Sequence, residues 1–150
     1  MSESDDRTGG PFTGVETAYI LRHRLGRLAT IGPDGAPQVR PVAFRFNPGD
    51  GTFDIGGPRL AASQKYHNLL ADPRAAFVID DVAPRSSRAP RPGYGRGIEV
   101  RGRAEALTVR DPARRLAPHH GDQLIRIRPA RIITWNLDGG HERPRGREVR

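Results

Sequence analysis

Most of the chain consists of short apolar stretches, separated by turns rich in glycine, proline and aspartate. Strands are predicted at 25–31, 38–46, 52–55, 75–79 and 98–107, with the last strands at 124–137 interrupted at Pro129. Alternation of apolar and polar side chains marks a strand with one buried face. Strands and long helices do not alternate as in a parallel βαβ fold. The pattern therefore predicts a mainly β protein, a small antiparallel barrel of six or more strands.

Two short helices are expected beside the strands. Thr13 and Glu16 have the spacing of a capping box, in which each side chain satisfies a backbone N–H at a helix start. This predicts a helix over 14–24 that places Val15, Ala18, Tyr19 and Arg22 on one face. Helical periodicity returns over 60–71, and one further helical turn is expected near 111–116.

The ends of the chain lack apolar periodicity. We expect a disordered N-terminal tail at 1–12, one domain at 13–138 and a disordered basic tail at 139–150. Residues 84–97, rich in proline, glycine and arginine, are expected to form a mobile basic loop. The chain has no cysteine and no apolar run of membrane-spanning length, so a cytoplasmic protein without disulfides is expected.

The excess of positive charge lies in the second half of the chain. Residues 1–84 carry a net charge of −1 and residues 85–150 a net charge of +9. Such a field attracts anions, including nucleic acids and phosphorylated cofactors. Solvated surface arginines are the alternative explanation.

Several kinds of chemistry have no support in the sequence. The chain contains no cysteine nucleophile, no Gly-x-Ser-x-Gly elbow, no GxGxxG strand-to-helix turn and no P-loop. His119, His120 and Asp122 carry metal-ligating groups, but neighbouring histidines on a flexible stretch rarely converge on one ion. No metal site is expected.

A candidate anion site lies where the third strand meets the second helix. The turn that ends in Arg59 leads into Ser63, Gln64, Lys65 and Asn68, and Lys65 is the only lysine. A helix N-terminus and a lysine one turn in can converge on a phosphate. The alternative is a lysine on a solvated helix face. Pro41, within the second strand, cannot donate a ladder hydrogen bond and must face an edge, a bulge or a ligand.

The order and the amino-acid sequences of four segments resemble those of a known family. They are 28–39 (LATIGPDGAPQV), 63–76 (SQKYHNLLADPRAA), 97–104 (GIEVRGRA) and 131–135 (RIITW). Together they are similar to the pyridoxamine-phosphate-oxidase-like split β-barrel (FMN-binding split barrel, Greek key), over about residues 13–137. The last segment is similar to the branch of coenzyme F-420 (deazaflavin)-dependent oxidoreductases.

The resemblance implies a homodimer that binds two flavin or deazaflavin cofactors in grooves between its subunits. It implies that hydride passes from reduced F-420 to an electron-poor small molecule, with the protein supplying binding and orientation. By position, the implied phosphate-holding residues are Ser63, Lys65 and Asn68, the ring-facing stretch is Arg40, Pro41 and Val42, and the closing-strand residues near a ring are Trp135 and Asn136. A core position is the alternative for Trp135.

The chain departs from the family pattern at Gln64, where oxidase relatives carry arginine or lysine, so Arg59 or Arg40 would have to substitute. It also lacks the arginine-rich ending of true pyridoxamine-phosphate oxidases, and that activity is not expected. The oligoglutamate tail of F-420 needs a basic trough, which the loop arginines would line: Arg85, Arg88, Arg91 and Arg96. Tyr94 and His67 are candidate proton donors by their chemistry alone.

Three alternatives remain open at this point. The first is an FMN-dependent oxidoreductase or flavin-binding protein of the same fold. The second is a barrel that carries or senses a flavin or heme without turnover. The third is a basic nucleic-acid-binding barrel, for which the second half supplies charge but few aromatic stacking platforms.

Overall fold

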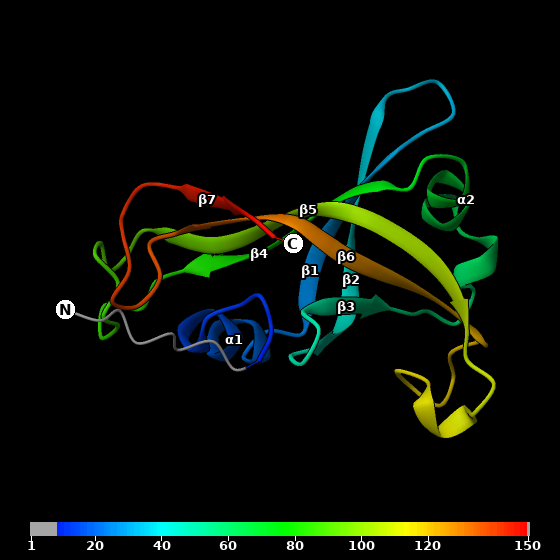
Figure 1. The fold of residues 1–150 in the computed structure, drawn as a ribbon, viewed down its shortest axis with the longest axis horizontal. Helices are drawn as coiled ribbons and strands as arrows, with labels where there is room; N and C mark the ends of the chain where they lie inside the picture. Colours follow the sequence, from blue (N-terminus) through cyan, green and yellow to red (C-terminus); the bar gives the residue numbers. More distant parts are fainter. Residues whose placement is uncertain (1–8, 150) are drawn as a thin grey trace.

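The computed structural model describes residues 9–149, and the parts of the predicted tails at 1–8 and Arg150 lie outside this range. The protein is mainly β, with two α-helices and two short 3-10 turns (Figure 1). In chain order the elements are α1 (Gly14–Leu21), β1 (Leu25–Ile31), β2 (Pro37–Asn47), β3 (Thr52–Ile55), η1 (Leu60–Ala62), α2 (Gln64–Ala71), β4 (Arg74–Val82), β5 (Gly95–Thr108), η2 (Pro112–Arg114), β6 (Gln123–Trp135) and β7 (Arg145–Glu148).

The strands form one antiparallel sheet in the order β3-β2-β1-β4-β5-β6-β7. A further pairing of β3 with β6 closes six of them into a barrel, and β7 adds to the outer side of β6. This confirms the predicted six-stranded antiparallel split barrel. The barrel is split at β2, because β3 pairs only with residues 44–47 and leaves the N-terminal part of β2 with an open edge. Pro41 lies on this part of β2, as its missing N–H required.

The barrel interior is packed with aromatic and branched side chains. Phe53 is fully buried and its ring centre lies 5.2 Å from that of Phe77. Gly26 in β1 lies directly against the Phe77 ring, so a side chain there has no room. Of the predicted inner face of β5, Ile98, Val100 and Ala104 are buried, whereas Ala106 is exposed where the strand leaves the barrel.

Helix α1 has the predicted capping box but a different buried face. The Thr13 N–H donates to Glu16 Oε1 at 2.9 Å and the Glu16 N–H to Thr13 Oγ1 at 3.2 Å. The helix ends at Leu21 and buries Glu16, Thr17, Tyr19 and Ile20, while Val15 is 43% exposed. The predicted face was wrong except at Tyr19, because the polar contacts of Glu16 and Tyr19 turn those side chains inward.

Both predicted tails are partly structured. Phe12 is 1% exposed and packs edge-on against Phe46 at 5.2 Å. Strand β7, within the supposed C-terminal tail, pairs with β6 and places Arg147 against Glu16 of α1. The predicted disorder was therefore wrong for 145–148, because backbone pairing to β6 requires no apolar alternation in the added strand.

The segment 84–97 is not a free basic loop. Strand β5 already begins at Gly95, and Ala83 and Ala89 are buried in the connection from β4. The Gly93 N–H donates to the Ala83 carbonyl at 2.7 Å. The predicted helix at 60–71 is also interrupted, since Ser63 has extended backbone between η1 and α2. Within residues 9–149, no helix is long and apolar enough to cross a membrane.

Candidate functional site

A pocket of about 580 Å³ lies between the open part of β2, strand β1 and the start of α2. Its volume is in the range of small-molecule and cofactor sites. The residues that line it are Leu28, Thr30, Gln38, Arg40, Pro41, Ser63, Gln64 and Lys65. The fold thus brings together five of the ten predicted site residues, from two segments more than 20 positions apart.

Polar side chains hold α2 against the β1–β2 hairpin. Ser63 caps the helix: its hydroxyl accepts from the Tyr66 N–H at 3.4 Å and donates to the Leu60 carbonyl at 2.6 Å. Asn68 is 2% exposed, and its amide nitrogen donates to Thr30 Oγ1 at 3.0 Å and Gln38 Oε1 at 2.8 Å. These groups fix the position of the helix above β1 and β2.

Gln64 is also committed to a contact within the fold. Its amide nitrogen donates to Asn68 Oδ1 at 2.8 Å. Two of the predicted phosphate-holding side chains, Ser63 and Asn68, likewise use their polar groups within the fold. The two cations of the pocket, Lys65 and Arg40, are its charged side chains.

The pocket contains two cations and no carboxylate. Neither Lys65 nor Arg40 forms an ion pair with a carboxylate among residues 9–149. Burial lowers the pKa of Lys65 below that of an ordinary lysine, and the nearby Arg40 guanidinium lowers it further. Two like charges held together without counterions favour the binding of an anion. A phosphate is the group that this donor set suits.

Four of the remaining predicted residues do not line this pocket in one chain. Val42 is 6% exposed and points into the core. Arg59 is exposed just before η1, outside the lining residues. Trp135 and Asn136 lie at the end of β6, and this end of the sheet is far from α2 (Figure 1).

Trp135 and Asn136 have clear structural surroundings. The Trp135 ring lies over Gly97, its partner on β5, and is half-buried. Asn136 has a left-handed backbone (φ 53°) and is 2% exposed. Its side chain accepts from the Arg91 N–H at 2.8 Å and donates to the Arg91 and Gly95 carbonyls at 2.9 and 3.1 Å. Asn136 thus anchors the connection between β4 and β5.

The predicted basic trough does not form beside Lys65 within one chain. Arg96 is 5% exposed and makes a two-pronged ion pair with Asp81 at 2.7 and 3.0 Å. Arg91 bonds to Glu142 at 3.0 Å. The connection between β4 and β5 lies at the opposite end of the molecule from α2 (Figure 1).

The two proton-donor candidates are also placed away from the pockets. Tyr94 is 57% exposed, with the Arg91 guanidinium 3.8 Å above its ring. His67 is exposed on α2 and does not line the basic pocket. Among residues 9–149, no cluster of three or more metal-ligating side chains occurs.

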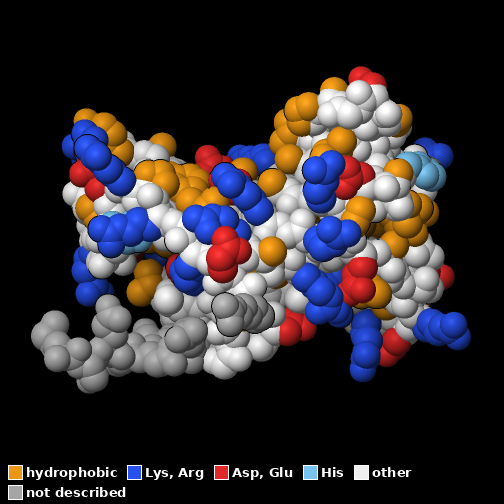
Figure 2. All heavy atoms as spheres, turned by 45° about the horizontal axis from the view of Figure 1, so that its top comes forward, with side chains coloured by type: hydrophobic (Ala, Val, Ile, Leu, Met, Phe, Trp, Pro, Cys, Tyr) orange, Lys and Arg blue, Asp and Glu red, His pale blue; other side chains and the backbone are white. Residues whose placement is uncertain are grey.

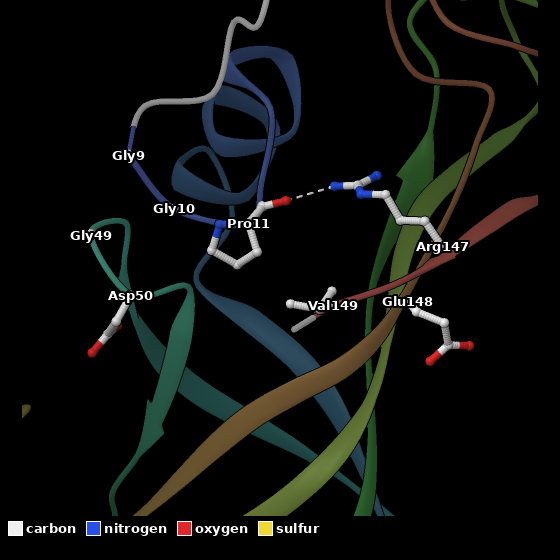
Figure 3. A pocket seen from close by; sticks show the side chains of 8 residues that line it. All are labelled: Gly9, Gly10, Pro11, Gly49, Asp50, Arg147, Glu148 and Val149. Atoms are coloured by element: carbon white, nitrogen blue, oxygen red, sulfur yellow. Dashed lines mark hydrogen bonds between the residues drawn. The ribbon is translucent and has the colours of Figure 1, made fainter.

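Another pocket, of about 500 Å³, lies between residues 9–11, the turn at 49–50 and residues 147–149 (Figure 3). Its cation, Arg147, donates to the Pro11 carbonyl at 2.9 Å and pairs with Glu16 of α1. Because its charge is already paired, this pocket lacks the unpaired cations of the one beside α2. It contains none of the predicted site residues.

The structure is an antiparallel split barrel with a basic pocket beside its open strand. A model of the family described as pyridoxamine 5'-phosphate oxidase matches residues 15–136 of the chain. The protein belongs to this family. The match spans the barrel from α1 to the end of β6, and β7 follows it.

Proteins similar to the chain include a reductase and two informative solved structures. A 5a,11a-dehydrotetracycline/5a,11a-dehydrooxytetracycline reductase from Streptomyces rimosus is 40% identical over 129 residues, which are 86% of each chain. A conserved hypothetical protein from Mycobacterium tuberculosis is 25% identical with a TM-score of 0.59, over 89% of this chain and 90% of that one. An F-420 reductase is 28% identical with a TM-score of 0.52, over 72% and 87%. These similarities support an oxidoreductase with a flavin-type cofactor.

Proposed function

We propose that the protein is a reductase that uses reduced coenzyme F-420 to transfer a hydride to an electron-poor small molecule. The observation that carries this proposal is the pair of cations, Lys65 and Arg40, held without a carboxylate beside an open strand edge. The pocket offers what a phosphorylated coenzyme needs: a place for the phosphate and a strand along which a flat ring can lie.

The residues present fit the phosphate and ring of such a coenzyme. Lys65 and Arg40 would hold the phosphate through charge-assisted hydrogen bonds. The residues 37–43 of β2 lack a neighbouring strand on one side and would face the ring. When bound, the coenzyme supplies the hydride chemistry, and the protein holds and orients it.

One of the similarities supports F-420 as the coenzyme of this proposal. The F-420 reductase is 28% identical to the chain, whereas a FAD-binding protein at 20% identity shares only the fold. The Streptomyces rimosus relative is named as a reductase of a polycyclic compound. The second similarity supports a reduction of an organic acceptor.

A homodimer would complete the site. The outward-facing side chains of β2, β1 and β4 are mostly apolar, and Val39, Leu25 and Val82 are 62%, 54% and 65% exposed. Val39 lies opposite Ala29, which in turn lies opposite Ala76, so the apolar surface continues across three strands. Figure 2 shows hydrophobic side chains in and beside the hollow between the two raised parts of the molecule. A second copy would cover this surface.

The same dimer would account for the residues that one chain leaves apart. The Trp135 end of β6 and the arginines Arg85 and Arg88 would approach a coenzyme only from the partner subunit. On the outer face of β5, Glu99 lies between Val78 of β4 and Ile133 of β6, and Gly97 lies opposite Trp135. We therefore propose that the ring and the oligoglutamate tail lie between the two subunits.

Direct titration tests the coenzyme. Purified protein is titrated with F-420, FMN and a single-stranded oligonucleotide, each at 50 and 200 mM salt. We expect binding of F-420 with the highest affinity and turnover of reduced F-420 in the presence of enones or quinones. If FMN binds more tightly than F-420, FMN is the coenzyme and the F-420 part of the proposal is wrong. Oligonucleotide binding that falls steeply with salt, without coenzyme binding, would support the nucleic-acid alternative.

A charge on the apolar surface tests the dimer. Val39→Asp should convert the dimer to a monomer in light scattering and weaken coenzyme binding, because a carboxylate cannot be desolvated there without a partner. Val15→Asp is the matched control, since Val15 is 43% exposed on α1 and outside this surface. A wild-type protein that is monomeric at micromolar concentration would refute the dimer.

A further inference from the structure

Strand β2 lines a second pocket, of about 590 Å³, which lies between the end of α1, this strand and the segment 109–122. Most of its wall is apolar: Ile20, Leu21, Ala43, Phe44, Phe46, Leu116 and Ala117. Its polar side chains are His23, Arg45, His119 and His120. An apolar cavity of this size with a few polar groups suits a flat, mostly hydrophobic molecule with oxygen substituents.

Strand β2 connects this pocket to the basic pocket beside α2. Residues 38–41 of β2 include the lining of the basic pocket, and residues 43–46 line the second pocket. Pro41 and Ala43 project to the same side of the strand, about 7 Å apart. A molecule in the second pocket would therefore lie next to a ring that extends along Arg40, Pro41 and Val42.

His23 enters the second pocket in a fixed orientation. Its Nδ1 lies 2.7 Å from the carbonyl oxygen of Tyr19. A carbonyl only accepts, so Nδ1 carries the proton in this hydrogen bond. Its Nε2 lies 3.8 Å from Asp81 Oδ2, too far for a hydrogen bond but close enough for charge attraction. Nε2 makes no hydrogen bond among residues 9–149, so a proton on this nitrogen can pass to another acceptor.

A carboxylate, that of Asp81, lies beside His23. Asp81 receives hydrogen bonds from the Tyr19 hydroxyl at 2.7 Å and from the buried Arg96 guanidinium. Burial raises the pKa of Asp81, but the bonds from Arg96 and Tyr19 outweigh it and lower the pKa, so the carboxylate stays charged. His23 packs against the Tyr19 ring, with the ring centres 4.4 Å apart.

The other charged and titratable groups of the pocket come from β2 and from the segment 109–122. Arg45 pairs with the buried Asp54 at 3.2 Å and donates to the Arg114 carbonyl at 3.2 Å. Burial lowers the pKa of His120, and His119 lowers it further. Of the three histidines of this pocket, His23 is the one that has a carboxylate, that of Asp81, beside it.

We propose that this second pocket binds the acceptor, a planar conjugated enone or quinone, and that His23 supplies the proton that completes its reduction. The inference rests on the proposed function, because reduced F-420 is the source of the hydride. The hydride and its two electrons form a C–H bond at the electron-poor β-carbon of the acceptor. The resulting enolate takes the proton from His23 Nε2, and the neutral imidazole regains a proton from water.

Single-turnover kinetics of His23→Gln test the proton transfer. Reduced F-420 and 5a,11a-dehydrotetracycline, the substrate named for the 40% identical relative, serve as reactants. We expect the rate of reduction to fall about 100-fold, to lose the pH dependence of the wild type and to show an altered solvent deuterium isotope effect. The dissociation constant of F-420 should not change. His67→Gln is the matched control, since His67 is exposed on α2.

Filling the pocket tests the place of the acceptor. Ala117→Trp should raise KM for the acceptor at least tenfold without weakening F-420 binding, because the indole would occupy the pocket that Ala117 lines. Ala113→Trp is the control, on the exposed surface of η2. Thermal melting of each variant checks that the fold is retained.

The outcomes separate this inference from the proposed function. If the wild type binds neither reduced F-420 nor FMN, the proposed function fails, and this inference fails with it. If the wild type reduces the acceptor while His23→Gln keeps the wild-type rate and pH profile, His23 is not the proton donor. If Ala117→Trp keeps the wild-type KM, the acceptor binds elsewhere.

Discussion

Replacement of Lys65 by alanine should change coenzyme binding and stability in opposite directions. In the protein without ligand, the Lys65 ammonium is partly buried beside Arg40 and has no carboxylate partner among residues 9–149. Its removal eliminates a desolvated charge and a like-charge repulsion. We therefore expect Lys65→Ala to melt at the wild-type temperature or slightly above it.

The effect on coenzyme affinity follows from the lost contact to the phosphate. A hydrogen bond to a charged group contributes about 1.5–3 kcal/mol. Because Lys65 is only half-buried, solvent screening favours the lower end of this range. Each 1.4 kcal/mol is a factor of ten in affinity, so the dissociation constant of F-420 should rise by about tenfold or somewhat more.

Fluorescence titration with F-420 and thermal melting measure the two effects in the same samples. Lys65→Arg keeps the charge and should retain most of the affinity, whereas Arg59→Ala, outside the pocket, should have no effect. An unchanged dissociation constant for Lys65→Ala would remove Lys65 from the phosphate site. A fall of several degrees in melting temperature would show instead that Lys65 has a structural role.

The pH dependence of binding has a defined sign. The lowered pKa of Lys65, caused by burial and by Arg40, means that its charge is lost at a lower pH than in an unfolded chain. Coenzyme affinity should therefore decline as the pH rises through this lowered value, and Lys65→Arg should abolish the decline. Over the same window the unfolded chain still binds the proton, so the stability of the ligand-free protein should increase with pH.

Three further predictions concern the fold. Asp54→Asn should lower the free energy of unfolding by about 3–5 kcal/mol in chemical denaturation. The reason is that Arg45 and Arg126 then face a buried side chain that no longer carries a negative charge. Burial raises the pKa of Asp54, but hydrogen bonds lower it more. This stabilisation should therefore be fully present above the unfolded pKa and be lost as the pH falls through the lower pKa of the folded protein. Equal acid sensitivity of wild type and variant would contradict this. Arg147→Ala should cost about 1–3 kcal/mol by leaving the buried Glu16 carboxylate unpaired, and a double-mutant cycle with Glu16→Gln should show coupling. Gly97→Ala should cost about 1–3 kcal/mol or more, since its methyl group would meet a β4 carbonyl at 2.6 Å and the Trp135 ring at 2.7 Å; an unchanged denaturation midpoint would mean that the two strands can separate there.

Much of the barrel could be predicted from local patterns. The hairpin of β1 and β2 and the strand β3 were recognisable because alternation and turn residues are encoded by neighbours in sequence. The capping box of α1 was found for the same reason. The buried face of α1 was not, because it depends on Asp81 and Arg147, which come from distant strands.

The residues of the site were only partly predictable. Sequence order placed Ser63, Gln64 and Lys65 at a helix start, and the fold brings Arg40 and Pro41 to the same pocket. The cofactor roles of these residues stay predictions. Hydrogen-bond commitments decide which side chains remain available to a ligand, and no local pattern reveals them.

His23 is the clearest example of a residue whose surroundings could not be predicted from the sequence. It follows α1 in an ordinary turn, and nothing nearby in sequence indicates a carboxylate partner, since Asp81 lies 58 positions away on β4. The local pattern of apolar residues and turns by itself determined that the chain forms an antiparallel barrel with a lysine at a helix start. Only the tertiary structure decided which charges are neutralised and which remain unpaired, because the partners of a charged group are set by pairing between strands that are distant in the chain.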